Sequence, residues 1–428
     1  MISRRERVLA ALNFEETDRL PKDLGGMLST GISCFAYPHL VKALGLPPRL
    51  PRLHDQSQML ALPDTDVLDA LDCDVVTVLG TTTNAFPQPG RWKEYDFNGR
   101  LRAKVHDPDD FQVLEDGTIY QSRWNIRMPP EACVFNEDHA GQSLDFMDFE
   151  ELPLKDLEQL KEDLKKQLPD SKEIKQLKAI FAQIRKYTDR AVFYTGPGTA
   201  EIGISAHGGI GVFPLICKFH PDYVADYHEI MTRHTLEKME RVLPEIRDGL
   251  DIFMQAGDDW GTQNHTITSP EVFRTLFLPY YRRMNEAAHQ LAPEAKTFLH
   301  SCGAIYDIID DIVEGGFDVL NPVQWTAGGH SFAEWKEKCH GRIALWGGGI
   351  NTQVTLPFGS IDDVNEEVSE ICEVLGEGGG YVFNAIHNLL ANVDPHKIIA
   401  MYETAGAVRR RRTSIQVTYR KATHEEAN

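Results

Sequence analysis

The sequence predicts an α/β protein that folds as a (β/α)8 barrel, or TIM barrel, with a β-hairpin insertion. Short apolar or β-branched segments bounded by turn residues recur along the chain, and helical patterns separate most of them. Alternation of strands with helices is typical of a parallel sheet, and eight repeats suit a closed barrel. An open, doubly wound sheet is the alternative. The expected strands cover residues 21–25, 74–79, 191–196, 252–259, 296–302, 319–323, 343–347 and 381–384.

Helix signals lie between these strands. Ser3 and Glu6 have the spacing of a capping box, which predicts a helix that ends near Asn13. Ser269 followed by Pro270 is typical of a helix start, with proline at the first helical position. Further helices are expected over residues 32–45, 66–71 and 362–375, and over a highly charged helical segment, 154–189.

Residues 81–150 have a different pattern. Alternating polar and apolar residues there are separated by Asn98-Gly99 and Asp116-Gly117, dipeptides that favour tight hairpin turns. We therefore expect a β-hairpin insertion over one end of the barrel. The domain prediction is a single TIM barrel over residues 1–407, followed by a basic tail over 408–428.

Composition narrows the function. The chain has 428 residues and a formal net charge of -20, which argues against binding nucleic acid through a basic face. Its basic cluster, Arg409 to Arg412, is expected to be a solvated tail. The seven cysteines are scattered without a CxxC pair, which is typical of cytosolic proteins. Without an apolar run of signal-peptide or membrane-span length, we expect a cytoplasmic protein and no membrane partner.

Unusual polar residues follow the expected strands. The active site of a TIM barrel lies at the carboxyl ends of its strands, so these residues are expected to meet at one mouth. They form the strand-end segments Asp23–Gly26, Gly257–Gln263, His300–Gly303, Asn321–Gln324, Trp346–Ile350 and Asn384–Asn388.

His300 and Cys302 suggest a zinc site. They lie two residues apart on one strand, so their side chains share a face and offer an imidazole nitrogen and a thiolate to a metal. Catalytic zinc usually takes three protein ligands and keeps one position open, and His387 is the first candidate for the third. Asp259 and Cys339 are the other candidates. The alternative is that both histidines are hydrogen-bonded core residues and Cys302 is a small buried apolar residue.

The remaining strand-end residues receive predicted roles. Asp258 and Asp259 are adjacent on a strand, so only one can point into the barrel, although Asp-Asp beside glycine also forms ordinary turns. Trp260 and Trp346 could stack on a flat substrate or simply pack, and Gly347–Gly349 does not fit a nucleotide-binding pattern. We assign catalytic roles to Asp259 and Gln263, and substrate binding to Asp23, Asn321, Trp346 and Asn384.

In this order the motifs resemble the uroporphyrinogen decarboxylase superfamily, whose fold is a (β/α)8 barrel. The resemblance extends over nearly the whole chain. The segments that carry it are Arg19–Pro21 with Asp23–Gly26, Gly257–Gln263 with Ser269–Phe273, His300–Gly303, Val319–Gln324 and Gly378–Asn384.

Two departures from the decarboxylases point to another branch. True decarboxylases carry an arginine-rich RQAGR motif after the first strand, where this chain has Gly25–Ser29, so decarboxylation of a porphyrinogen is not expected. His-x-Cys-Gly looks like the zinc-dependent, corrinoid-linked methyltransferases. In the coenzyme M branch a later cysteine completes the zinc site, and His387 falls near that position.

The resemblance is greatest to the methyltransferase components of O-demethylase systems. It implies transfer of a methyl group from a methoxylated, often aromatic, compound to the cobalt(I) corrinoid of a partner protein, with bound Zn²⁺ as a Lewis acid. A corrinoid-binding DxHxxG motif is absent from the sequence. Methyl transfer from a methylcorrinoid to a thiol, a metal-free decarboxylase-like activity and a non-enzymatic binding barrel are the alternatives. The oligomeric state is left open, a homodimer included.

Overall fold

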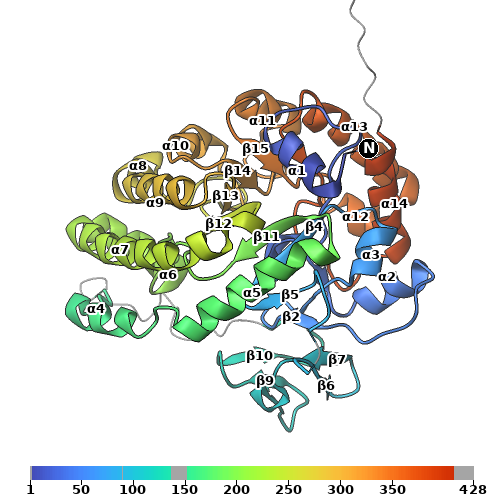
Figure 1. The fold of residues 1–428 in the computed structure, drawn as a ribbon, viewed down its shortest axis with the longest axis horizontal. Coiled ribbons are helices and arrows are strands. Elements are labelled where there is room, and N and C mark those ends of the chain that lie inside the picture. Colours follow the sequence, from blue (N-terminus) through green and yellow to red (C-terminus); the bar gives the residue numbers. More distant parts are fainter. Residues whose placement is uncertain (1, 89, 136–151, 409–428) are drawn as a thin grey trace, which may run out of the picture.

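The computed structural model describes residues 2–88, 90–135 and 152–408, and its centre is a parallel sheet (Figure 1). Seven strands of this sheet run in parallel, and each pairs with the next parallel strand along the chain. The parallel strands are β4 (Val75–Leu79), β11 (Ala191–Thr195), β12 (Ile252–Gly257), β13 (Lys296–His300), β14 (Val319–Asn321), β15 (Ala344–Trp346) and β16 (Tyr381–Val382).

Residues 21–23 close this sheet into a barrel. Lys22 bridges Phe383 in parallel, and the Asp23 N–H donates to the Phe383 carbonyl at 2.9 Å. On the other side, the Asp74 N–H donates to the Lys22 carbonyl at 2.7 Å. This segment occupies the eighth parallel position, between β16 and β4, and confirms the predicted (β/α)8 barrel.

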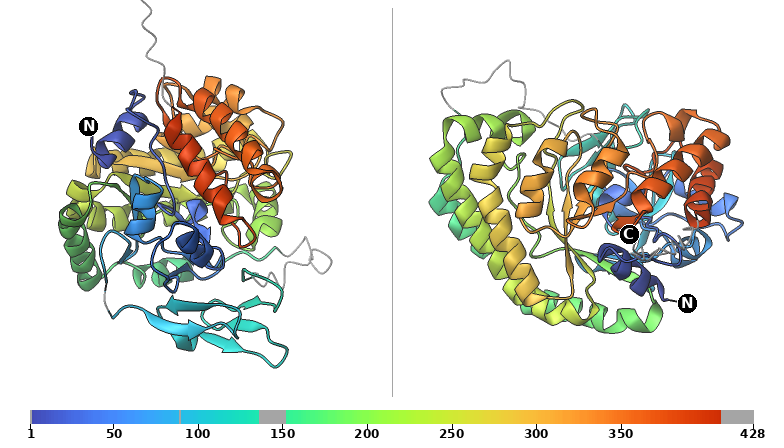
Figure 2. Two further views of the ribbon diagram at one scale, coloured as in Figure 1. Left: turned by 90° about the vertical axis from the view of Figure 1, so that its right-hand side faces the viewer. Right: turned by 90° about the horizontal axis from the view of Figure 1, so that it is seen from above.

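Helices surround the barrel (Figures 1 and 2). After the first strand position come α2 (Tyr37–Ala43) and α3 (Thr65–Ala70), and the later crossovers are α4 (Leu157–Lys165), α5 (Ser171–Tyr187), α6 (Gly209–Phe219), α7 (Pro221–Ile246), α8 (Pro270–Leu276), α9 (Leu278–Leu291), α10 (Ile309–Glu314), α11 (Phe332–Cys339), α12 (Thr355–Phe358), α13 (Ile361–Gly376) and α14 (Pro395–Ala407). Among the described residues, no helix combines the length and apolar character needed to cross a membrane.

Two helix predictions need adjustment. The charged segment forms two helices, α4 and α5, because Pro169 interrupts it and Asp170 caps the second one. The helix expected from residue 32 begins only at Tyr37, because Ile32–Ser33 form a short strand, β1, that pairs with β3 (Leu60–Ala61). Burial of β1 against another strand outweighs local helix propensity there.

The barrel interior is apolar and aromatic. Phe193, Phe298 and Trp346 make edge-on contacts with one another, with ring centroids 4.8–6.0 Å apart. The predicted first helix, α1 (Arg4–Leu12), packs against β4, β11 and β16 and adds Val8 and Leu12 to the same cluster. The predicted Ser3–Glu6 capping box is present. α1 therefore covers the amino-terminal end of the strands and leaves the opposite mouth for the polar residues.

Each of the two predicted hairpin turns connects a pair of antiparallel strands. These strands lie to one side of the barrel (Figure 2). Thr82–Thr83 (β5) instead pairs with β4, so the strands outside the barrel begin with β6. These strands are β6 (Lys93–Asp96), β7 (Arg102–Val105), β8 (Phe111–Val113), β9 (Ile119–Gln121) and β10 (Ile126–Met128), and β2 (Leu53–Asp55) joins β1 and β3 in a small sheet. The rest of the expected insertion, 136–150, and the tail 409–428 lie outside the described residues.

Candidate metal centre

Three side chains from two strands meet at the open mouth of the barrel. His300 ends β13, Cys302 follows it by two residues, and His387 follows β16. One ligand atom from each of the three lies within 4.8 Å of the other two. The structure thus brings together the predicted metal ligands, although they come from distant parts of the sequence.

The ring of His300 is held by a buried amide. Its Nδ1 lies 2.7 Å from Oδ1 of Asn321, whose Nδ2 donates to the Trp346 carbonyl at 2.9 Å. With Nδ1 donating to this acceptor, the Nε2 lone pair faces the mouth, 3.3 Å from Cys302 Sγ. A hydrogen bond to the second ring nitrogen is the usual way in which proteins orient a histidine that binds metal.

Asp259 lies beside this pair. Its Oδ1 accepts the backbone N–H of Cys302 at 2.8 Å and lies 3.5 Å from His300 Nε2. Partial desolvation raises the pKa of Asp259, but His300 and the Cys302 backbone outweigh it and lower this pKa overall. Asp259 therefore lies at the candidate metal centre and holds the backbone of Cys302, and its catalytic role stays a prediction.

Asp258 points the other way from Asp259, as predicted, although β12 ends at Gly257 and both residues lie just past it. Its carboxylate accepts the N–H of Ile204 and, at 2.7 Å, the hydroxyl of Ser205. Burial is the main reason why the pKa of Asp258 is raised to about 6. Asp258 therefore fastens the loop after β11, while Asp259 belongs to the mouth.

Two glycines allow the ends of β12 and β13 to approach. Gly303 has φ +86°, and a Cβ built on it would lie 2.2 Å from the Gly261 carbonyl oxygen. A Cβ on Gly261 would lie 2.2 Å from the Ala304 nitrogen. At this crossing the Gly261 N–H donates to the Cys302 carbonyl at 3.1 Å. Only glycine at both positions permits this contact, which fixes the backbone of Cys302.

The charges at the mouth depend on one another. Burial alone would lower the pKa of His300, but the Cys302 sulfur and the Asp259 carboxylate raise it well above its usual range. Burial, with a further contribution from His300, lowers the pKa of His387 to about 4. His387 is thus neutral, the form of histidine that binds metal, whereas a metal ion has to displace the proton that the raised pKa leaves on His300.

The donor set fits zinc. Two imidazoles and one thiolate are ligands that Zn²⁺ prefers, and three protein ligands leave one coordination position open. Zinc–ligand bonds of about 2.0–2.3 Å in a tetrahedral site place neighbouring ligand atoms about 3.3–3.8 Å apart. The separation of 3.3 Å between His300 Nε2 and Cys302 Sγ agrees with that geometry. The ligand atoms of His300, Cys302 and His387 lie up to 4.8 Å apart, so these side chains would have to move slightly closer together to bind zinc.

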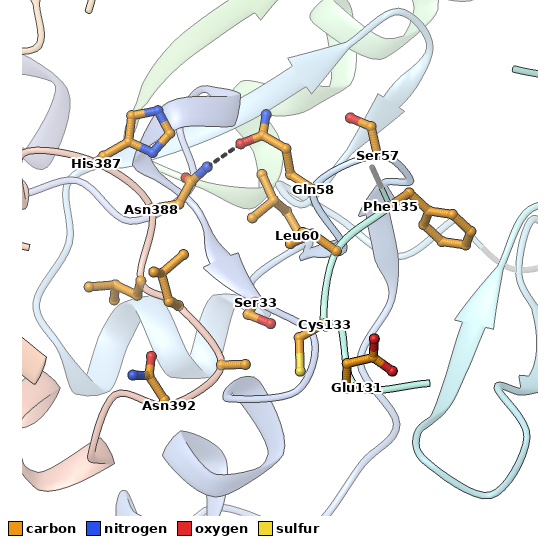
Figure 3. A pocket seen from close by; sticks show the side chains of 14 residues that line it. Ser33, Ser57, Gln58, Leu60, Glu131, Cys133, Phe135, His387, Asn388 and Asn392 are labelled. Atoms are coloured by element: carbon orange, nitrogen blue, oxygen red, sulfur yellow. Dashed lines mark hydrogen bonds between the residues drawn. The ribbon is translucent and has the colours of Figure 1, made fainter. Parts of the chain in front are cut away.

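A cavity of about 870 Å³ opens beside the metal centre (Figure 3). Its walls come from the β1–β3–β2 sheet, from residues 131–135 at the end of the insertion, and from the loop after β16. His387 belongs both to this wall and to the ligand cluster. A small molecule in the cavity would therefore reach the candidate metal centre at its His387 end.

A family model named for uroporphyrinogen decarboxylase (URO-D) matches residues 141–408. The matched region contains β11 to β16 and every residue of the candidate ligand cluster. The chain belongs to the uroporphyrinogen decarboxylase family.

Curated family members are distant in sequence. The uroporphyrinogen decarboxylase of Chloroherpeton thalassium is 25% identical over 43% of this chain, and that of Geotalea daltonii is 25% identical over 41%. Each match spans about half, 48%, of the relative's own length. Among solved structures, a methyltransferase from Methanosarcina mazei superposes with a TM-score of 0.53 at 15% identity, covering 95% of this chain and 98% of that one. At this identity the likeness shows the fold.

The URO-D fold places the predicted substrate-binding residues deeper than the mouth. Each has at most 1% of its surface exposed, which leaves none of them accessible to a substrate in this conformation. The Trp346 indole donates to Asp23 Oδ2 at 3.1 Å, and Asn384 Nδ2 donates to the Asp23 carbonyl at 3.1 Å. With Asn321 behind His300, these residues form a hydrogen-bonded layer under the metal centre.

Gln263, the second predicted catalytic residue, lies at the rim. Its side chain is exposed and donates to the Thr326 carbonyl at 2.7 Å, which connects the loops after β12 and β14. This contact holds the side-chain amide of Gln263 against the neighbouring loop. It does not test a catalytic role for Gln263, which stays a prediction.

Sequence reasoning gave no role to Ser29 or Gln324. Ser29, on a short turn of helix over Leu28–Thr30, has its hydroxyl 3.2 Å from His300 Nε2. Gln324 accepts the Gly303 N–H at 2.8 Å and so supports the turn after Cys302. Ser29 lies where decarboxylases of this family were expected to carry their arginine motif, and that replacement was the signal that could have drawn attention to it.

Proposed function

We propose that this protein is a methyltransferase that takes a methyl group from a methoxylated aromatic compound and passes it to the cobalt(I) corrinoid of a partner protein. The observation that carries the proposal is the convergence of His300, Cys302 and His387 at the edge of a substrate-sized cavity. The fold shared with a solved methyltransferase supports it, and so does the absence of the arginine motif from the sequence.

Phenolate is a poor leaving group, so the reaction requires that the negative charge on the departing oxygen be stabilised. The bond between the ether oxygen and the methyl carbon breaks, the electron pair of cobalt(I) forms the new bond to carbon, and the oxygen leaves as a phenolate that takes up a proton from water. Bound Zn²⁺ supplies Lewis acidity that stabilises the negative charge gained by this oxygen.

The residues of the chain would prepare the site. His300, Cys302 and His387 would hold the metal, and Asn321 keeps the His300 Nε2 lone pair directed at it. Asp259 fixes the Cys302 backbone, and the Gly261–Gly303 crossing leaves that backbone little freedom. A ligand set that is already in place lowers the reorganisation needed during reaction.

Metal analysis and one substitution test the proposal. We expect about one zinc per chain, and transfer of methyl from a methoxyarene to a reduced corrinoid protein. Cys302→Ala should lose bound zinc and activity together. Cys339→Ala is the matched control: its thiol is buried in α11, away from the mouth, and the variant should retain both. Full activity of a zinc-free protein would refute the proposal. Methylation of a thiol from a methylated corrinoid, without the forward reaction, would favour the reverse direction.

A further inference from the structure

We infer that the cavity beside His387 binds the ring of the methyl donor and selects against a carboxylate on that ring, so that the substrates are uncharged methoxyarenes. The inference rests on the proposed function and specifies its substrate class. Three properties of the cavity carry it: its position, its apolar surfaces and its charge.

The cavity has a metal end and a distal end. Figure 3 shows His387 at one end and Glu131 at the other, with Leu60 between them. A volume of about 870 Å³ is within the range of small-molecule sites. A methoxy group that meets the metal at the His387 end therefore leaves the opposite substituents of the ring near Glu131.

The surfaces between the two ends are apolar. Leu60, Phe135 and Leu389 back the cavity and are at most 4% exposed, whereas the lining residues Val134 and Leu390 are 37% and 50% exposed and offer the ring an apolar surface. Two of the lining amides are bonded to each other: Asn388 donates to Gln58 Oε1 at 2.8 Å, and it also accepts the Gly31 N–H at 2.7 Å. An aromatic ring gains from burial against such surfaces, because apolar contact needs no polar partner.

The charge of the described lining disfavours a carboxylate in the cavity. Among the described residues that line it there is no lysine or arginine, and Glu131 is the single residue with a formal charge. A ring carboxylate would lose part of its hydration and face a like charge at the distal end. A ring that carries hydrogen in the same place avoids both effects. The charge of the lining therefore distinguishes two methoxyarenes of nearly the same shape.

Binding of a matched pair tests the inference. The probes are 2-methoxyphenol and 4-hydroxy-3-methoxybenzoate, which differ by one carboxylate, and calorimetry on the zinc-loaded protein without corrinoid protein gives both affinities. We expect the neutral compound to bind about tenfold tighter or more. Glu131→Lys should tighten the benzoate about tenfold relative to the phenol.

Glu115→Lys is the matched control. It makes the same charge change in the same insertion, on an exposed residue that does not line the cavity, and should leave the selectivity unchanged. Equal or tighter binding of the benzoate by the unsubstituted protein would overturn the inference, as would an equal effect of both lysine variants. Binding of neither probe would overturn the cavity assignment. Methyl transfer from a broader panel of methoxy compounds tests the proposed function separately, so the two can fail independently.

Discussion

The two ends of the barrel balance a carboxylate in different ways. At the amino-terminal end, the buried carboxylate of Asp74 pairs with Arg7 and Arg19, each at 2.7 Å. At the mouth, the carboxylate of Asp259 accepts the backbone N–H of Cys302 and lies 3.5 Å from His300 Nε2, beside the cluster of His300, Cys302 and His387. Among the described residues, no lysine or arginine pairs with Asp259.

This comparison distinguishes charged groups that stabilise the fold from groups that could bind a metal ion. At the amino-terminal end, protein cations complete the charge balance, so nothing further is needed for stability. At the mouth, no lysine or arginine among the described residues balances Asp259; His300 does so, and unlike a guanidinium it can give up its proton to a metal ion. Clustering of titratable groups therefore points to function only where the protein has not paired them with lysine or arginine.

The largest expected effect tests the paired end. Asp74→Ala would leave two guanidinium groups, Arg7 and Arg19, without their buried partner and should lower the free energy of unfolding by about 3–5 kcal/mol. Urea unfolding measures the change. Zinc content per folded chain should not change, because Asp74 belongs to the opposite end.

Asp72→Ala provides the control for that loss. Asp72 also pairs with Arg19, at 2.7 Å, but its side chain is 49% exposed. An exposed pair of this kind contributes about 0–1 kcal/mol. A similar destabilisation by both variants, or loss of zinc from folded Asp74→Ala, would break the distinction between the two ends.

Asp23 tests the effect of burying a carboxylate that pairs with no lysine or arginine among the described residues. It is fully buried like Asp74, but its carboxylate accepts from the Gly26 N–H and the Trp346 indole, and burial is the main reason why its pKa rises from 3.8 to about 6. The protonated form thus favours the folded state. Stability from this group should be fully present below about pH 4 and lost as the pH rises through 6, with a total of about 3 kcal/mol.

The measurement is urea unfolding at several pH values between 4 and 7, on the protein and on Asp23→Asn. The difference between their free energies of unfolding should change over this range and be constant above it. A difference that does not vary with pH would show that Asp23 titrates normally, and that its neighbours stabilise the carboxylate as well as a cation would.

The smallest expected effect concerns the support of the metal centre. Asn321→Ala removes the acceptor at His300 Nδ1 and should weaken zinc binding by about 10–100-fold, or about 1.4–2.8 kcal/mol. Competition with a chelating dye measures this affinity. Asn285→Ala, which removes another buried asparagine, bonded to the Gly315 carbonyl, should leave it unchanged. Equal losses in both variants would mean that general destabilisation explains the effect.

Much of the molecule follows from local sequence signals. The alternation of short apolar strands with helices predicted the barrel, and the strand ends predicted where the polar residues meet. Strand geometry alone predicted that His300 and Cys302 share a face and that Asp258 and Asp259 do not, because side chains alternate along a strand. The turn dipeptides marked the hairpins in the same way.

Only the tertiary structure decided which of these residues are accessible. Asp23, Asn321, Trp346 and Asn384 follow strand ends in the sequence, yet the closed barrel buries them under the mouth. The place of His387 beside His300, and the cavity wall near Glu131, depend on contacts between segments far apart in the chain. Periodicity is a property of neighbouring residues, whereas burial and charge pairing depend on what packs against them from elsewhere.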